Sequence, residues 1–257
     1  MSGFEREHFT IGGIDTTVLV AGEGPPLVFW HGAGTFTGFD FALEWARTFR
    51  VYVPYHPGFG ESAVDESISA MHDYVMHYLD LLDALGLERF RLVGHSLGGW
   101  LAATFATEHA HRIERLALLS PVGLRVPEHP TIDIFKIPPH ELPGYLISNP
   151  ALLQQMMSAP PTVDMIVQQY REMTSAARVA WTRTYDTTLP RWLHRVRVPT
   201  LVLWGRQDRM LPAEQAAVWG RLLPQAEVQV LESSGHGLVI DDPAAVQAVQ
   251  DFMMLAH

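Results

Sequence analysis

Short apolar runs rich in β-branched and aromatic residues alternate along the chain with longer segments whose apolar residues recur every three or four positions. Runs of the first kind predict buried strands, and segments of the second kind predict amphipathic helices. The predicted strands fall at 8–11, 16–21, 26–30, 51–54, 89–94, 113–119, 200–204 and 227–231. Strands that alternate with helices are typical of a mostly parallel sheet covered on both faces. The pattern therefore predicts an α/β protein with an eight-stranded, mostly parallel, doubly covered sheet.

Two of the predicted helices carry clear boundary signals. Between 69 and 86 the apolar residues stand at helical spacing, and Gly86 is placed to close that helix. The last helix is predicted to begin at Asp242-Pro243, because aspartate accepts a hydrogen bond at an N-cap and proline fits the first turn. This capping role explains Asp242 without any catalytic chemistry.

Residues 122–189 interrupt the alternation of strands and helices. They are rich in proline and methionine and contain two helix-like stretches, at 151–157 and 163–178. A segment this long between two strands is rarely a bare loop. We therefore predict a helical cap over 122–189, inserted into a core formed by 1–121 and 190–257. Methionine is flexible and polarisable, and large apolar cap residues, Met157 and Trp181 first among them, are candidates for a substrate pocket.

Composition narrows the classes of function. The net charge is −10, and no basic face is apparent for phosphate binding. Cysteine is absent, which removes disulfides and thiol nucleophiles. The thirteen histidines lack the spacing of metal ligands, and the glycine-rich segments lack the spacing of nucleotide-binding loops. We therefore expect no cofactor, no metal and no nucleic-acid partner.

The chain start and the longest apolar runs bear on location. Residues 1–8 are polar and charged, where a signal peptide would need an apolar stretch. No apolar run approaches the length of a membrane span. We therefore expect a cytoplasmic protein without a membrane partner. The oligomeric state stays open, with a homodimer among the options.

The segment Gly94-His95-Ser96-Leu97-Gly98 is a G-x-S-x-G pentapeptide between a predicted strand and a run of good helix formers. Such a strand–turn–helix holds the serine in a strained conformation, and the glycines let strand and helix approach closely. The pattern predicts Ser96 as a nucleophile. His95 beside it is expected to border the substrate pocket and to pack or hydrogen-bond locally rather than to catalyse.

A serine nucleophile needs a base, an orienting acid and an oxyanion site. Asp208 and His236 each follow a predicted strand and are the candidate acid and base. Asp241 and Asp242 are rival acids, and Asp208 is favoured over them. The glycine turn after the 26–30 strand is predicted to aim the N–H of Ala33 at the oxyanion, with the N–H of Leu97 as its partner.

These motifs resemble the α/β-hydrolase family, specifically its capped serine-hydrolase branch of carboxylesterases, cofactor-free haloperoxidases and meta-cleavage carbon–carbon bond hydrolases. The order serine, aspartate, histidine along the chain is that of the family. The matching segments are His31-Gly-Ala-Gly34, Pro57-Gly-Phe-Gly-Glu-Ser62, Gly94-His-Ser-Leu-Gly-Gly99, Trp204-Gly-Arg-Gln-Asp208 and Gly235-His236. One departure is that Tyr55 and His56 stand where the family often has an aspartate.

Residues and resemblance together predict a cofactor-free serine hydrolase that cleaves a small to medium carboxylic ester through an acyl-enzyme. The first alternative is a carbon–carbon bond hydrolase of vinylogous diketone acids, which needs cationic groups near the pocket. The second alternative, from another class, is a non-catalytic or slow-turnover ligand-binding receptor on the same fold.

Overall fold

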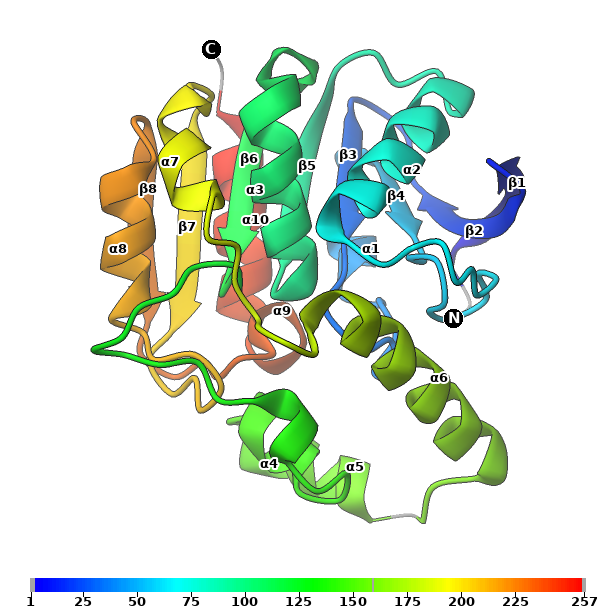
Figure 1. Ribbon diagram of the computed structural model, residues 1–257, viewed down its shortest axis with the longest axis vertical. Coiled ribbons are helices and arrows are strands. Elements are labelled where there is room, and N and C mark those ends of the chain that lie inside the picture. The colour runs from blue at the N-terminus through cyan, green and yellow to red at the C-terminus, as the bar shows by residue number, and fades with distance from the viewer. Residues whose placement is uncertain (1–2, 159, 256–257) are drawn as a thin grey trace.

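A computed structural model describes residues 3–158 and 160–255 (Figure 1). Its eight-stranded sheet has the order β1-β2-β4-β3-β5-β6-β7-β8. β1 pairs antiparallel with β2 and β2 with β4, and the remaining pairs are parallel. The strands are β1 (Glu5–Ile11), β2 (Ile14–Ala21), β3 (Pro26–Trp30), β4 (Arg50–Pro54), β5 (Phe90–His95), β6 (Ile113–Leu119), β7 (Thr200–Gly205) and β8 (Ala226–Leu231). The prediction of an eight-stranded, mostly parallel sheet is confirmed.

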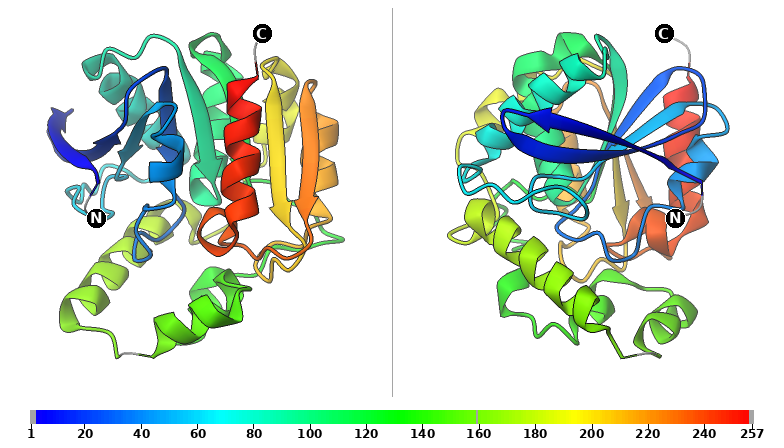
Figure 2. Two further views of the ribbon diagram at one scale, coloured as in Figure 1. Left: turned by 180° about the vertical axis from the view of Figure 1, so that it is seen from behind. Right: turned by 90° about the vertical axis from the view of Figure 1, so that its right-hand side faces the viewer.

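Helices cover both faces of the sheet, as Figures 1 and 2 show. α2, α3 and α8 pack on one face, and α1 and α10 pack on the other. Two separate clusters of buried apolar residues match these two layers. The helices are α1 (Ala42–Trp45), α2 (Met71–Ala84), α3 (Leu97–His109), α4 (Leu142–Leu146), α5 (Pro150–Met157), α6 (Val163–Ala180), α7 (Leu189–Trp192), α8 (Gln215–Leu222), α9 (Leu238–Asp241) and α10 (Pro243–Met254).

Local signals placed the helix ends correctly. Gly86 follows α2 with φ +69°. Its N–H donates to the backbone carbonyl oxygen of Asp83 at 3.0 Å, and the N–H of Leu87 donates to that of Leu82 at 2.9 Å. This is the hydrogen-bond pattern of a Schellman motif, which satisfies the last carbonyls of the helix. At the start of α10, the Asp242 carboxylate accepts from the N–H of Ala244 at 2.8 Å, as predicted for an N-cap.

The first strand was predicted too short. β1 begins at Glu5 rather than at residue 8, and its register pairs Glu5 with Val20. Its first residues are charged and exposed because β1 lies at the edge of the sheet. Backbone pairing with β2 therefore defines this part of the strand, where no buried side chains could signal it.

Helices α4, α5 and α6 lie beyond the carboxyl ends of the parallel strands (Figure 1). The chain reaches this layer and returns from it side by side: Gly123 forms an isolated parallel bridge with Tyr185, and its N–H donates to Thr184 at 3.1 Å. This paired neck lies within the predicted cap segment, near both of its ends. The layer therefore stands over the edge of the sheet at which the loops after β3, β5, β7 and β8 meet.

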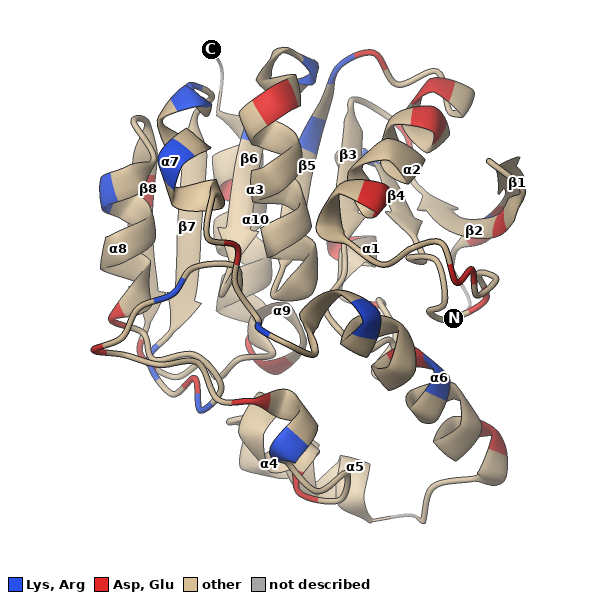
Figure 3. Cartoon of the chain, in the orientation of Figure 1, with Lys and Arg blue, Asp and Glu red and all other residues tan. Residues whose placement is uncertain are grey.

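Two further properties concern the surface and the bilayer. Acidic and basic residues are dispersed over many elements of the described chain (Figure 3). Among the helices of residues 3–158 and 160–255, none combines the length and the apolar character that a membrane crossing requires.

Candidate active site

Ser96 occupies the turn between β5 and α3, with φ 52° and ψ −111°. A β-carbon at Gly94 would lie 2.4 Å from the carbonyl oxygen of Gly98, and one at Gly98 would lie 2.1 Å from that of Trp30. Both distances are far inside van der Waals contact, so these positions require glycine for the turn to close. The sharp turn places the Ser96 side chain at the carboxyl edge of the sheet.

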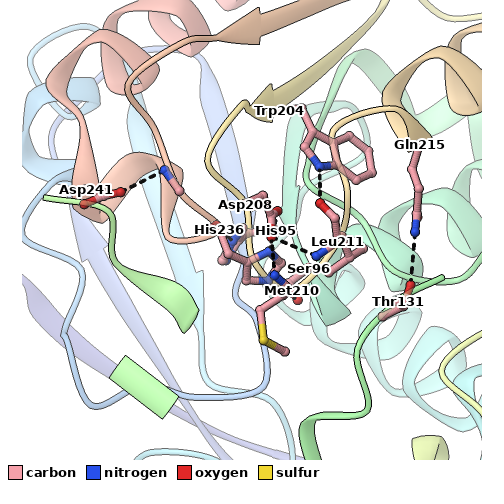
Figure 4. A network of polar contacts seen from close by, with 11 residues as sticks. His95, Ser96, Thr131, Trp204, Asp208, Met210, Leu211, Gln215, His236 and Asp241 are labelled. Atoms are coloured by element: carbon pink, nitrogen blue, oxygen red, sulfur yellow. Dashed lines mark hydrogen bonds and ion pairs between the residues drawn. The ribbon is translucent and has the colours of Figure 1, made fainter. Parts of the chain in front are cut away.

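The structure brings Ser96, His236 and Asp208 into one hydrogen-bonded line (Figure 4). The Nε2 atom of His236 lies 3.0 Å from the Ser96 hydroxyl, and its Nδ1 lies 2.8 Å from Oδ2 of Asp208. A carboxylate only accepts hydrogen bonds, so Nδ1 carries the proton and Nε2 presents its lone pair to the serine. This is the geometry of a nucleophile activated by a neutral base.

The second carboxylate oxygen of Asp208 is also fixed. It accepts from the N–H groups of Met210 and Leu211, both at 2.8 Å. Burial opposes ionisation of Asp208, but the interaction with His236 and these two N–H groups outweigh it and hold the pKa of the carboxyl below its ordinary value. Asp208 is therefore an oriented anion behind the imidazole.

The rival acids have other partners. One carboxylate oxygen of Asp241 accepts from the N–H of Gly235 and from the N–H of Ser148, both at 2.9 Å. Asp242 caps α10 and accepts from the hydroxyl of Ser234 at 2.7 Å. The carboxylate that meets the imidazole is that of Asp208.

Ala33 and Leu97 both border the cavity above Ser96. Ala33 lies in the loop after β3, and Leu97 is the first residue of α3. Within the described chain, neither backbone N–H donates a hydrogen bond to another protein group. Ala33 and Leu97 therefore remain the candidates for an oxyanion hole, which needs free backbone donors beside the nucleophile.

The cavity has a volume of about 110 Å³. Ser96, His95 and His236 line its floor, while Phe135, Ile147 and other residues of segment 122–189 line its roof. Among the described residues around it, none is a lysine, arginine, aspartate or glutamate. The site is therefore a small apolar chamber that opens onto one nucleophile.

Two predicted pocket residues lie elsewhere. Met157 and Trp181 are 58% and 68% exposed, and neither borders the cavity. Trp181 packs against the roof residue Phe135, with the ring centroids 5.3 Å apart and the rings tilted by 52°. The prediction was wrong because it considered the size of these side chains and not the direction in which they point. On α6, Ala176 and Ala180 lie one turn apart and line the cavity. The next residue, Trp181, points away from the cavity because neighbouring residues of a helix lie on different faces.

His95 borders the cavity, as predicted, and its Nε2 lies 2.8 Å from the backbone oxygen of His236. Because that oxygen only accepts, Nε2 carries the proton. Burial and the neighbouring imidazole lower the pKa of His95 to about 3, so the ring stays neutral. It ties the loop of the base to the strand of the nucleophile.

A second histidine pair under the glycine turn was missed by the sequence reasoning. The backbone N–H of His56 donates to the ring atom Nε2 of His31 at 3.1 Å. The ring atom Nε2 of His56 lies 2.8 Å from the backbone carbonyl oxygen of His31. His56 also contacts the Tyr78 hydroxyl through Nδ1. Burial lowers the pKa of His31 to about 3 and that of His56 well below its ordinary value.

A family model described as "Alpha/beta hydrolase family" matches residues 27–249. The chain is 28% identical to a 2-hydroxy-6-oxo-2,4-heptadienoate hydrolase of Pseudomonas putida, over 94% of each chain. It is 27% identical to a 2-hydroxymuconate semialdehyde hydrolase of a Pseudomonas species, over 94% of this chain and 91% of that one.

Solved structures share the fold. A meta-cleavage product hydrolase from Pseudomonas fluorescens superposes with a TM-score of 0.80 at 21% identity, covering 96% of each chain. An esterase from a Rhodococcus species superposes with a TM-score of 0.79 at 19% identity, covering 98% of each chain. Similar chains thus include hydrolases named for a dienoate, a semialdehyde or a meta-cleavage product, and an enzyme named as an esterase.

Proposed function

Because the chain belongs to the α/β-hydrolase family, we propose that it is a cofactor-free serine hydrolase that cleaves a small to medium carboxylic ester through an acyl-enzyme. The observation that carries the proposal is the line of hydrogen bonds from Asp208 through His236 to Ser96, which ends in an apolar chamber. This combination activates one hydroxyl beside a space that suits an uncharged acyl group.

The proposed reaction has two halves. The Ser96 oxygen attacks the ester carbonyl while Nε2 of His236 takes the hydroxyl proton, and Asp208 stabilises the imidazolium. The N–H groups of Ala33 and Leu97 bind the oxyanion of the tetrahedral intermediate. When the intermediate collapses, the carbon–oxygen bond to the alcohol breaks and the imidazolium protonates the leaving oxygen. Water, deprotonated by the same imidazole, then releases the acid and restores Ser96.

The size of the chamber supports a short acyl group. An apolar protein cavity of about 150 Å³ holds one benzene molecule, and the chamber here measures about 110 Å³. The roof residues Phe135, Leu142 and Ile147 would contact the acyl chain. We therefore expect turnover to fall once the acyl chain outgrows this space.

The second candidate is carbon–carbon bond hydrolysis of a vinylogous diketone acid. It is favoured by relatives that are 27–28% identical over 94% of this chain and carry the names of such hydrolases. Against it stands the charge of the substrate: a buried carboxylate without a cationic partner is costly, and the described lining of the chamber contains no lysine or arginine. The ester is the better match to this lining.

A ligand-binding receptor on the same fold is the third candidate. Binding alone does not require an imidazole that is hydrogen-bonded to both a serine and an aspartate, as His236 is here. A receptor would bind the intact ester without releasing alcohol, whereas the hydrolase releases it.

The decisive experiment compares substrates on the purified protein and on the Ser96→Ala variant. We expect the native protein to hydrolyse p-nitrophenyl acetate and butyrate with saturation, and the variant to lose this activity at an unchanged melting temperature. Turnover of a vinylogous diketone acid without turnover of either ester would establish the second candidate instead. Tight binding without turnover of any of these compounds would establish the receptor.

A further inference from the structure

Glu172 is a buried carboxylate that the reaction above does not use. It lies on α6, in the layer over the site, and is only 2% exposed. Among the described residues, no ion pair includes it. A buried carboxylate without a cation requires hydrogen-bond donors in its place. The donors around Glu172 therefore show which segments of the chain its carboxylate holds in place.

Four donors surround the carboxylate, and they come from three segments of the chain. Oε2 accepts from the N–H of Thr35 at 2.9 Å. Oε1 accepts from the N–H of Gly60 and from the side-chain amide of Gln168, at 3.0 and 2.9 Å, and it contacts the Thr35 hydroxyl. One carboxylate of the overlying layer therefore fastens the loop after β3 and the loop after β4 together.

The loop after β3 is the one that carries Ala33. Thr35 follows Ala33 by two residues, and no regular element holds this stretch. Glu172 thus fixes both the backbone and the side chain of Thr35 two residues from Ala33, which borders the chamber. Donors of an oxyanion hole act through placement, because the hydrogen bond must be ready where the charge develops.

We propose that Glu172 is a positioning residue for the oxyanion hole: through its carboxylate, helix α6 holds the loop that presents the Ala33 N–H to the reacting oxygen. The inference rests on the proposed function, since it assigns Glu172 a part in the same reaction. A carboxylate that only fastened α6 to the core would affect stability and substrate fit, but it would not act selectively on the charged intermediate.

The test is the Glu172→Gln variant, which keeps the shape of the side chain. One acceptor oxygen becomes an NH₂ donor, and it must then face a group that also donates. We expect kcat for p-nitrophenyl butyrate to fall by about 10- to 100-fold, as misplacement of a catalytic donor does, with KM changed by less than about twofold. The inhibition constant of a trifluoromethyl ketone, whose adduct with Ser96 carries the oxyanion, should rise by the same factor as kcat falls.

Two further variants complete the design. Thr35→Val removes the hydroxyl that contacts Glu172 and that accepts from the Gln168 amide at 2.9 Å, but it keeps the Thr35 N–H bond to the carboxylate. It should therefore give the same pattern with a smaller loss, and it serves if Glu172→Gln does not fold. Asp164→Asn removes an exposed carboxylate from the same helix and should leave kcat, KM and inhibition unchanged.

The outcomes separate this inference from the proposed function. Native protein that hydrolyses no ester overturns the proposed function. Native protein that hydrolyses esters, with folded Glu172→Gln or Thr35→Val proteins that keep native kcat, overturns the positioning role. A rise in KM at constant kcat also overturns it, because that result assigns Glu172 to the shape of the pocket alone.

Discussion

Acidification should destabilise this fold before its carboxylates titrate, because several histidines are buried in the neutral form. Burial lowers the pKa of His31 and of His95 to about 3, that of His77 to about 4, and that of His56 well below its ordinary value. An unfolded histidine titrates near ~6.5. Below that pH the unfolded chain binds protons that the native protein does not, so stability falls as pH falls.

The magnitude follows from proton linkage. Each histidine that stays neutral in the native protein and titrates at ~6.5 in the unfolded chain removes about 2 kcal/mol between pH 7 and pH 5. For these four histidines together, taken as independent groups, the loss is about 8 kcal/mol. This loss is comparable with the whole stability of an ordinary domain, about 5–15 kcal/mol. Above pH ~6.5 histidine is largely neutral in both the native and the unfolded chain, so these groups add no further stability at higher pH.

Urea unfolding at pH 7, 6 and 5 measures this effect directly. The His95→Asn variant lacks one of the titrating groups, so its loss between pH 7 and 5 should be smaller than that of the native protein by about 2 kcal/mol. His140→Gln is the control, because the His140 side chain is 79% exposed and should leave the slope unchanged. A total loss below about 2 kcal/mol, or equal slopes for both variants, would refute the reasoning.

Three other substitutions test separate parts of the account. Gly94→Ala should lower the free energy of unfolding by about 1–3 kcal/mol, because its β-carbon would lie 2.4 Å from the carbonyl oxygen of Gly98. Urea unfolding measures this loss, and native stability would contradict the close packing of the turn. Ile147 borders the chamber, so Ile147→Ala should shift substrate preference toward longer acyl chains by about 1–3 kcal/mol per methylene-sized change. Trp181 is exposed, so Trp181→Ala should leave the chain-length profile unchanged. The opposite ranking of the two variants would place the pocket elsewhere. Asp208→Asn should reduce kcat by about 10⁴-fold with the fold retained, because its amide would donate toward the imidazole and select the wrong tautomer; activity within tenfold of native would remove the assigned role of the carboxylate.

Much of the fold could be predicted from the sequence because its signals are local. Buried strands appear in the sequence as short apolar runs. Gly86 and Asp242 mark helix ends because each makes a hydrogen bond to a residue only two or three positions away. The turn at Ser96 is equally local, since glycines must stand on either side of it for steric reasons. His236, which is hydrogen-bonded to Ser96, and Asp208, which is hydrogen-bonded to His236, lie far along the chain. Each follows a strand of a parallel sheet, and such strands end at one edge.

The rest depends on contacts between distant segments. Thr35 and Glu172 are 137 residues apart, and no periodicity in the sequence marks a carboxylate that will receive backbone donors from another layer. The roof of the chamber was misjudged for the same reason, because the rotation of α6 against the core decides that Ala180 faces inward and Trp181 outward. The partnership of His31 with His56 depends on two loops meeting under the sheet edge.

If the proposed reaction is right, Ser96 becomes acylated by an ester during turnover. Rapid acid quenching of the protein while it turns over p-nitrophenyl butyrate, followed by peptide mass spectrometry, detects this acyl-enzyme. We expect one butyryl group on the peptide that contains Ser96, and none on the same peptide of the Ser96→Ala variant. Steady turnover with a butyryl group on another residue, or turnover that persists in Ser96→Ala, would contradict it.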